Sequence, residues 1–295
     1  MKDKKNSVEV TEEVRNIPLS ELHPFKDHPF KVRDDEAMAE TMESVKEYGV
    51  LMPAIARPLE TGGYELISGH RRHRACELAE LSHMPVIVRN VDDDKATIIM
   101  VDSNLQRENI LPSERAFAYK MKLEAIKKQG NRTDLTSTQI GQKLENGKTS
   151  IEMIAENAGT SKNQVQRYIS LTKLDPKILD MVDNKQMGFT PAVEISSLTQ
   201  EEQIDFLDVL DAEQSIPSLS QAQRIKALSK DGNCNFDTMS AIMSEEKKSE
   251  IGKISFSTDT IKKYFPKSYT PEKMQEAIMK LLENHLKNKK KQQER

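Results

Sequence analysis

The sequence contains no tryptophan, two cysteines and few aromatic residues, which make up 5% of its 295 positions. Two cysteines, Cys76 and Cys234, are too few for a disulfide framework and favour the reducing cytosol. No run of about 18 apolar residues predicts a membrane helix, and residues 1–10 lack the apolar core of a signal peptide. We therefore expect a cytoplasmic, helix-rich protein with small cores.

Signatures of metal binding and catalysis are also missing from the sequence. The histidines are scattered, and neither a CxxC pair nor an HExxH motif is present. Such motifs place several ligands around one metal ion. The pattern of residues therefore predicts no zinc site and identifies no catalytic residue.

Charge is distributed unevenly along the chain, although the formal net charge is −3. Residues 1–111 hold 15 basic and 21 acidic side chains, and residues 175–250 hold 7 and 15. Residues 112–174 hold 11 basic and 6 acidic side chains, and residues 251–295 hold 11 and 5. Because binding to phosphate groups needs a locally positive face, residues 112–174 are a candidate nucleic-acid interface.

Residues 150–171 have the pattern of a helix-turn-helix. Gly159 suits a turn that needs a positive φ, and the hydroxyl of Ser161 can cap the second helix. A helical hairpin with a polar face is the alternative, but the glycine, the cap and the apolar spacing agree on DNA binding. The predicted core positions are Ile154, Ala155, Ala158, Val165, Tyr168 and Ile169.

The second helix of this motif presents polar side chains outward, where a recognition helix meets base edges and phosphates in the major groove. The predicted DNA-binding residues are Ser161, Lys162, Asn163, Gln164, Gln166 and Arg167, with Arg115, Lys120 and Lys122 as further phosphate contacts.

Residues 68–75, SGHRRHRA, connect a predicted strand at 64–68 to a predicted helix at 71–81. Backbone N–H groups at a helix start and guanidinium groups together suit phosphate oxygens. A basic helix start on the surface explains these residues alone equally well. A second polar cluster at 103–109, SNLQREN, follows a predicted helix at 94–105 and could hold a ligand or simply end that helix.

The chain as a whole predicts three folded regions after a flexible N-terminus at residues 1–15. Alternating strands and helices indicate an α+β domain at 16–111, and helical periodicity indicates an all-α domain at 112–230. A long helix is expected at 112–128. A small, mostly helical region with a basic tail is expected at 235–295.

The linker before this last region is expected at 232–236, followed by a strand at 253–257 and helices at 258–264 and 271–288. The apolar positions of the last helix suggest either a dimer face or packing within the chain. These positions are Met274, Ile278, Leu281 and Leu282.

The order of these motifs resembles the ParB family of chromosome and plasmid partition proteins, over about residues 14–215. The resemblance rests on GVLMP at 49–53, YELI running into GHRRHRA at 64–75, SNLQRENILPSERA at 103–116, and the helix-turn-helix. It implies a ParB/sulfiredoxin-like α+β domain, an all-α helix-turn-helix domain, and a role in partition of a plasmid, chromosome or mobile element.

The resemblance also implies ligands and partners. Family members bind a palindromic parS-like site in double-stranded DNA as homodimers, and CTP with Mg²⁺ closes them into a sliding clamp. A ParA-type ATPase would contact the N-terminal tail, whose basic residues are Lys2, Lys4, Lys5 and Arg15. The residues that match the nucleotide motifs are Gly69, Arg71, Arg72, Asn104, Gln106 and Arg107, with Asn104 as the Mg²⁺ ligand.

Three departures from the family pattern bear on nucleotide chemistry. His70 replaces a glutamate, Met52 replaces a glutamine, and Ser103 replaces the acidic residue associated with metal and hydrolysis. A serine cannot act as a carboxylate base or an anionic ligand, and Asp102 points about 100° away on a helix. The resemblance thus favours CTP binding, whereas Ser103 argues against CTP hydrolysis. Binding without a metal ion and loss of nucleotide binding are the open alternatives.

Two other classes of function stay open. A transcriptional regulator could keep the helix-turn-helix above an N-terminal domain that binds no nucleotide. Enzymes also use this fold, but a sulfiredoxin-like site needs a cysteine where His70 stands. A nuclease needs clustered carboxylates, and Asp92 to Asp94 are explained more simply as a helix start.

Overall fold

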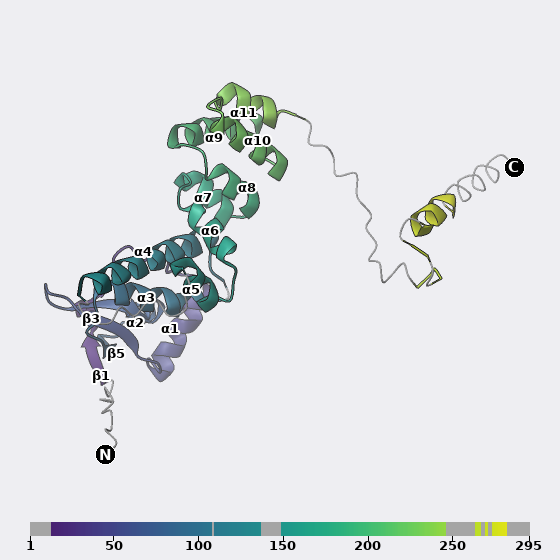
Figure 1. Ribbon diagram of the computed structural model, residues 1–295. Coiled ribbons are helices and arrows are strands. Elements are labelled where there is room, and N and C mark those ends of the chain that lie inside the picture. The colour runs from purple at the N-terminus through teal and green to yellow at the C-terminus, as the bar shows by residue number, and fades with distance from the viewer. Residues whose placement is uncertain are drawn as a thin grey trace, which may run out of the picture. The chain divides into compact units, whose positions relative to one another are not determined.

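The computed structural model describes residues 13–107, 109–136, 149–245, 263–266, 269–270 and 273–281. The chain divides after Glu245 into two units, and the first contains the sheet and the helices labelled in Figure 1. Within the described ranges, the helices are too short or too polar to cross a membrane.

Five short strands form one mixed sheet in the order β1-β5-β3-β4-β2. β1 (Val14–Pro18) is antiparallel to β5 (His83–Val88), which lies parallel to β3 (Ala54–Pro58). β4 (Tyr64–Ser68) is antiparallel to β3 and parallel to β2 (Leu22–Pro24). The apolar residues 51–58, LMPAIARP, suggest a strand, but the strand starts at Ala54, because residues 51 and 52 form a bend.

Three helices complete the predicted α+β domain: α1 (Glu36–Tyr48), α2 (His70–Leu78) and α3 (Asp93–Leu105). α1 and α2 pack against one another, and α3 packs on β4. Cys76 of α2 is fully buried. The core shared by the sheet, α1 and α2 includes Ile17, Met38, Val45, Ala54, Leu66, Ala75, Cys76 and Met84.

α4 (Pro112–Thr136) connects the α+β domain to the helices that follow it (Figure 1), because it contacts both α3 and the helices between residues 150 and 183. The helix was expected to end at 128 and continues past Gly130, whose helix-breaking preference does not stop it. The polar sequence of residues 130–148 suggests either a loop or a weakly formed helix, and residues 137–148 of this stretch lie outside the described residues.

α5 (Ser150–Asn157) and α6 (Lys162–Leu171) form the predicted helix-turn-helix. Gly159 has a φ of +61°, and the Ser161 hydroxyl accepts from the Gln164 N–H at 3.2 Å. Ile154 and Val165 are fully buried. Ala158, Tyr168 and Ile169 pack against the same core, so the apolar spacing identified the inward face correctly.

Five short helices follow, and they share one core. The residues expected to form a linker, 232–236, lie almost wholly in the loop at 231–235. The helix after this loop is not a separate region, because Met239, Ile242 and Met243 bury it against the two helices that precede it. The helical region therefore runs to Glu245. The helices are α7 (Pro176–Asp183), α8 (Phe189–Ile195), α9 (Gln200–Glu213), α10 (Leu219–Lys230) and α11 (Phe236–Met243).

The second unit contains a helix over residues 273–281. Met274 is 8% exposed and Leu281 is 65% exposed, so only part of the expected apolar face is covered within this unit. The expected strand at 253–257 and the position of Leu282 lie outside the described residues.

Replacing Gly159 by alanine should lower the free energy of unfolding by about 1 kcal/mol, because a Cβ is disfavoured at this left-handed φ while the space around it is open. Gly159→Asn should cost less, since asparagine tolerates this conformation. Urea unfolding of the full chain measures both. An alanine variant as stable as the wild type would contradict the left-handed turn.

Candidate functional site

The turn between β4 and α2 is built around Gly69, which has a φ of 106° and precedes the first turn of α2. A Cβ at this position would lie 2.8 Å from the Cβ of Ala54 and 3.2 Å from Nη2 of Arg72. Gly69 supplies no side-chain cap, so the first N–H groups of α2 are left for another acceptor. This arrangement is the one that binds anions at helix starts.

Three guanidinium groups gather at this turn. Arg71 and Arg72 lie in the first turn of α2, and Arg107 follows the end of α3. Burial lowers the pKa of Arg107, and the nearby charges of Arg71 and Arg72 lower it further, while Glu114 opposes them. The Arg107 guanidinium lies over the Phe30 ring, 5.9 Å from its centroid. The structure therefore brings the two predicted nucleotide motifs to one place.

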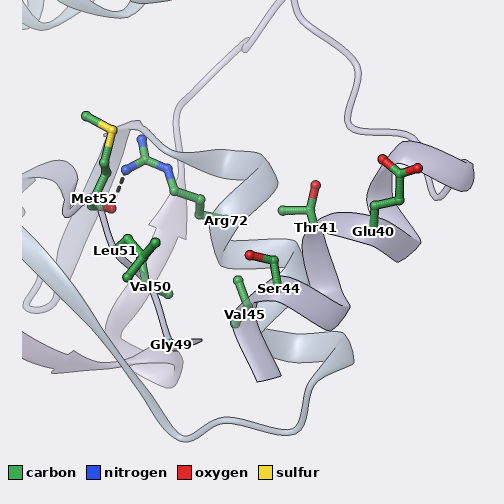
Figure 2. Close-up of a pocket in the computed structure, with 9 residues that line it drawn as sticks. All are labelled: Glu40, Thr41, Ser44, Val45, Gly49, Val50, Leu51, Met52 and Arg72. Atoms are coloured by element: carbon green, nitrogen blue, oxygen red, sulfur yellow. Dashed lines mark hydrogen bonds between the residues drawn. The ribbon is translucent and has the colours of Figure 1, made fainter. Parts of the chain in front are cut away.

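Arg72 also forms the end of an open groove between α1 and residues 49–52 (Figure 2). Its Nη1 donates to the carbonyl oxygens of Met52 and Pro53 at 2.5 and 2.8 Å. Glu40, Thr41 and Ser44 form the polar wall on α1, and the opposite wall consists of Gly49, Val50, Leu51 and Met52. A polar wall, an apolar wall and a cationic end suit a flat heterocycle attached to phosphates.

His70, which replaces the expected glutamate, is packed into the domain and is 8% exposed. Its Nε2 accepts from the Phe25 N–H at 3.4 Å, and its ring centroid lies 3.8 Å from that of His28. Burial, followed by the charges of His28, His73 and Arg107, lowers the pKa of His70 to about 3. A neutral ring therefore stands where a carboxylate was expected.

Asn104, the predicted metal ligand, is 2% exposed in the last turn of α3. Its Nδ2 donates to the Met100 carbonyl oxygen at 2.8 Å, while its buried Oδ1 has no hydrogen-bond partner in the described structure. A buried oxygen without a partner is unfavourable, and a hard cation or a ligand donor would satisfy it. Ser103 is exposed, and its hydroxyl donates to the same Met100 carbonyl at 2.9 Å.

The described residues contain no group of three histidine, cysteine or acidic side chains that could hold a metal ion. Gln106 is exposed and caps the end of α3. A cation beside Asn104 would therefore take most of its ligands from the bound anion and from water.

The prediction that Lys122 contacts phosphate is wrong. Lys122 is 2% exposed, and its ammonium group pairs with Asp102, which fixes α4 against α3. This pairing was missed because helical spacing within α4 does not reveal a carboxylate on another helix. Arg115 lies over the Tyr168 ring, 5.4 Å from its centroid, and Lys120 is half-buried.

On the outward face of α6, some side chains are exposed to solvent and others are held by contacts with neighbouring residues. Asn163 and Gln166 are exposed, while Lys162 pairs with Glu152 of α5 at 3.0 Å. The Thr149 N–H and then Lys162 lower the pKa of Glu152 to about 2. Ser161 acts as the helix cap.

Arg167 is held by residues of α8 that the sequence analysis did not identify. Its Nη2 donates to Thr190 Oγ1 at 2.8 Å, its Nη1 donates to Gln164 Oε1 at 3.5 Å, and its guanidinium lies 5.0 Å from the Phe189 ring centroid. These contacts orient Arg167 and Gln164 before any ligand binds. No local sequence motif links α6 to Thr190 and Phe189.

Comparison with known proteins gives one family match and several relatives. The model of the ParB N-terminal domain matches residues 3–105. Stage 0 sporulation protein J of Bacillus subtilis is 31% identical over 226 residues, which cover 73% of this chain and 72% of that protein. A nucleoid occlusion protein of Listeria innocua is 29% identical over 215 residues, 71% of this chain and 68% of that protein. The match to the Geobacillus thermodenitrificans nucleoid occlusion protein, 34% identical, spans 47% of that protein and 48% of this chain.

Two solved structures of C-terminally truncated ParB from Caulobacter crescentus are also similar. The complex with the centromeric parS site is 22% identical, covers 74% of this chain and 99% of its own, and has a TM-score of 0.43. The complex with CTP-gamma-S is 26% identical, covers 63% of this chain and 92% of its own, and has a TM-score of 0.31. Because both TM-scores are below 0.5, the relationship rests on the sequence matches.

The folded protein should lose stability through His70 as the pH falls. Its pKa is about 3 when folded and 6.5 in an unfolded chain, so the unfolded state takes up the proton first. The free energy of unfolding that His70 contributes is fully present above pH 6.5 and is lost as the pH falls toward 3. The loss is no more than about 1.4 kcal/mol per pH unit.

His70→Gln keeps an acceptor for the Phe25 N–H and should flatten the decline in unfolding free energy between pH 6.5 and 5. The exposed His83→Gln is the control for loss of a histidine. An NMR titration in which His70 gains a proton near pH 6.5 would contradict the packed neutral ring.

Proposed function

Because this chain belongs to the ParB family, we propose that it is a sequence-specific double-stranded DNA-binding protein of chromosome partition or nucleoid occlusion that holds CTP in its N-terminal domain. The observation that most supports a nucleotide site is that Arg71, Arg72 and Arg107 lie close together beside the start of α2. The Caulobacter relatives bound to parS and to CTP-gamma-S support these two classes of ligand.

The phosphates of the nucleotide would lie against the first N–H groups of α2, where Arg71 and Arg107 supply charge-assisted hydrogen bonds. The base and sugar would occupy the groove between α1 and residues 49–52 (Figure 2). Arg72 belongs to both parts, because it lines the groove and lies in the first turn of α2.

Mg²⁺ fits this site through the unpartnered Oδ1 of Asn104, with phosphate oxygens and water as its other ligands. When bound, the ion would neutralise phosphate charge. The neighbouring Ser103 is a hydroxyl, and Asp102 is committed to Lys122. This environment lacks a free carboxylate on residues 102–104, so we propose binding of CTP without efficient hydrolysis.

DNA recognition would depend on α6, with Asn163, Gln164 and Gln166 facing base edges. Arg167 is oriented by Thr190 and Phe189, which lowers the entropy lost when it contacts DNA. A palindromic site would be read by two copies of α6, so a homodimer is part of this proposal. A ParA-type ATPase partner is a further prediction.

Gln164→Ala should weaken binding to a parS duplex by about 1–3 kcal/mol, because a side chain that reads a base edge is lost. Binding to a scrambled duplex should change little. Fluorescence anisotropy at one salt concentration measures both. An equal loss on the two duplexes would assign Gln164 to phosphate contact or folding.

Arg71→Ala should weaken CTP binding about 10- to 100-fold, the usual effect of losing a charge-assisted hydrogen bond. Isothermal titration with CTP and Mg²⁺ measures the loss, and ATP and GTP titrations test the base preference. Arg224→Ala, which removes an exposed arginine paired with Glu245, is the control. Absence of CTP binding by the wild type, or equal binding by Arg71→Ala, would refute the nucleotide site.

A further inference from the structure

Two carboxylates already face the arginines of α2. Asp35 Oδ1 lies 3.7 Å from Nη2 of Arg71. The Asp34 carboxylate accepts from Nε and Nη2 of Arg74 at 3.1 and 2.7 Å, and Arg74 lowers the pKa of Asp34. Asp35 is also the N-cap of α1, accepting from the Met38 N–H at 3.0 Å. The start of α1 is therefore tied to the outer face of α2.

The segment 25–35 holds these carboxylates in place. The Phe25 N–H donates to His70, and the Lys31 N–H donates to Oε1 of the buried Glu114 at 2.9 Å. Phe30 lies beneath the guanidinium of Arg107. The segment therefore contacts Arg107 through Phe30 and Arg71 through Asp35, while Asp34 contacts Arg74, one helical turn beyond Arg71 on α2.

We infer that Asp34 and Asp35 are internal competitors of the anion, so that a polyphosphate must displace their carboxylates from Arg74 and Arg71 to bind fully. The inference rests on the proposed function for the identity of the ligand as a nucleoside triphosphate. The two aspartates thereby set the affinity of the site.

Exchange of the two carboxylates for a polyphosphate is energetically favourable. Both ion pairs are partly exposed, with side-chain exposures of 30% and 50% for Arg71 and Asp35 and 39% and 52% for Arg74 and Asp34. Such pairs are weak because water and salt screen them. A polyphosphate carries more charge, and it also meets Arg107 and the free N–H groups of α2, so it outcompetes a single carboxylate.

The exchange also has a structural consequence. Asp35 caps α1, and Glu40, Thr41 and Ser44 of the same helix line the groove that ends at Arg72 (Figure 2). Loss of the contact between Asp35 and Arg71 would therefore remove one link between α2 and the helix that forms one wall of the groove, while the cap of that helix could stay in place.

The test is the double variant Asp34→Asn with Asp35→Asn, titrated with inorganic triphosphate and with CTP. Asparagine caps a helix as well as aspartate does, so α1 keeps its start. The matched control is Asp92→Asn with Asp93→Asn. Asp92 caps α3 and Asp93 pairs with Arg57, so the same two kinds of contact and the same charge are removed at another helix start.

Triphosphate should bind about three- to tenfold more tightly to the Asp34/Asp35 variant, which corresponds to losing two exposed ion pairs. The control should bind as the wild type does. In an Arg71→Ala background, replacing both aspartates should increase triphosphate affinity by less, because one of the two arginines for which carboxylate and phosphate compete is absent. If the increase came only from the change in net charge, it would be the same in this background.

Equal triphosphate affinities in the variant and the control would overturn the inference, as would failure of all three proteins to bind triphosphate. A gain with triphosphate together with no preference for CTP over triphosphate would support the competition and refute the nucleotide function. Tighter binding of both ligands supports both.

Discussion

Three positive charges lie close together at the start of α2, and the candidate anion site of the N-terminal domain depends on their proximity. Like charges repel, and burial strengthens that repulsion. The chain compensates each charge differently: Asp35 faces Arg71, two carbonyl oxygens bind Arg72, and the face of Phe30 covers Arg107. Such partial compensation leaves an anion with more to gain at this site than at an ordinary basic surface.

The start of α4 supports both candidate sites. Ser113 donates to Asp183 of α7, Glu114 accepts from the Lys31 N–H, and Arg115 lies over Tyr168 of α6. Consecutive helical residues point in different directions, so one turn of α4 contacts the segment beside the arginines and also α6, the proposed recognition helix, and α7. The two sites therefore share one structural support.

Local patterns in the sequence predicted the elements and caps well, because those depend on near neighbours. The left-handed Gly159, the Ser161 cap and the buried Ile154 and Val165 all follow from spacing. The nucleotide residues were matched by resemblance, and nothing in the composition placed Arg107 beside Arg71.

The features that were missed depend on contacts between distant segments. The burial of Lys122 requires Asp102 on another helix, and the packing of the His70 ring requires His28, which precedes α1. The orientation of Arg167 requires Phe189 and Thr190 of α8. The hydrophobic periodicity of a helix shows which of its sides faces the core. It does not show which residues of other segments that side will contact.

Hydrogen–deuterium exchange of the full chain with and without CTP and Mg²⁺ tests the central claim most directly. The account predicts slower exchange at the first turn of α2 and at residues 104–107, where the two motifs meet. Unchanged exchange at both places under saturating CTP, or protection confined to α5 and α6, would contradict an anion site built from these arginines.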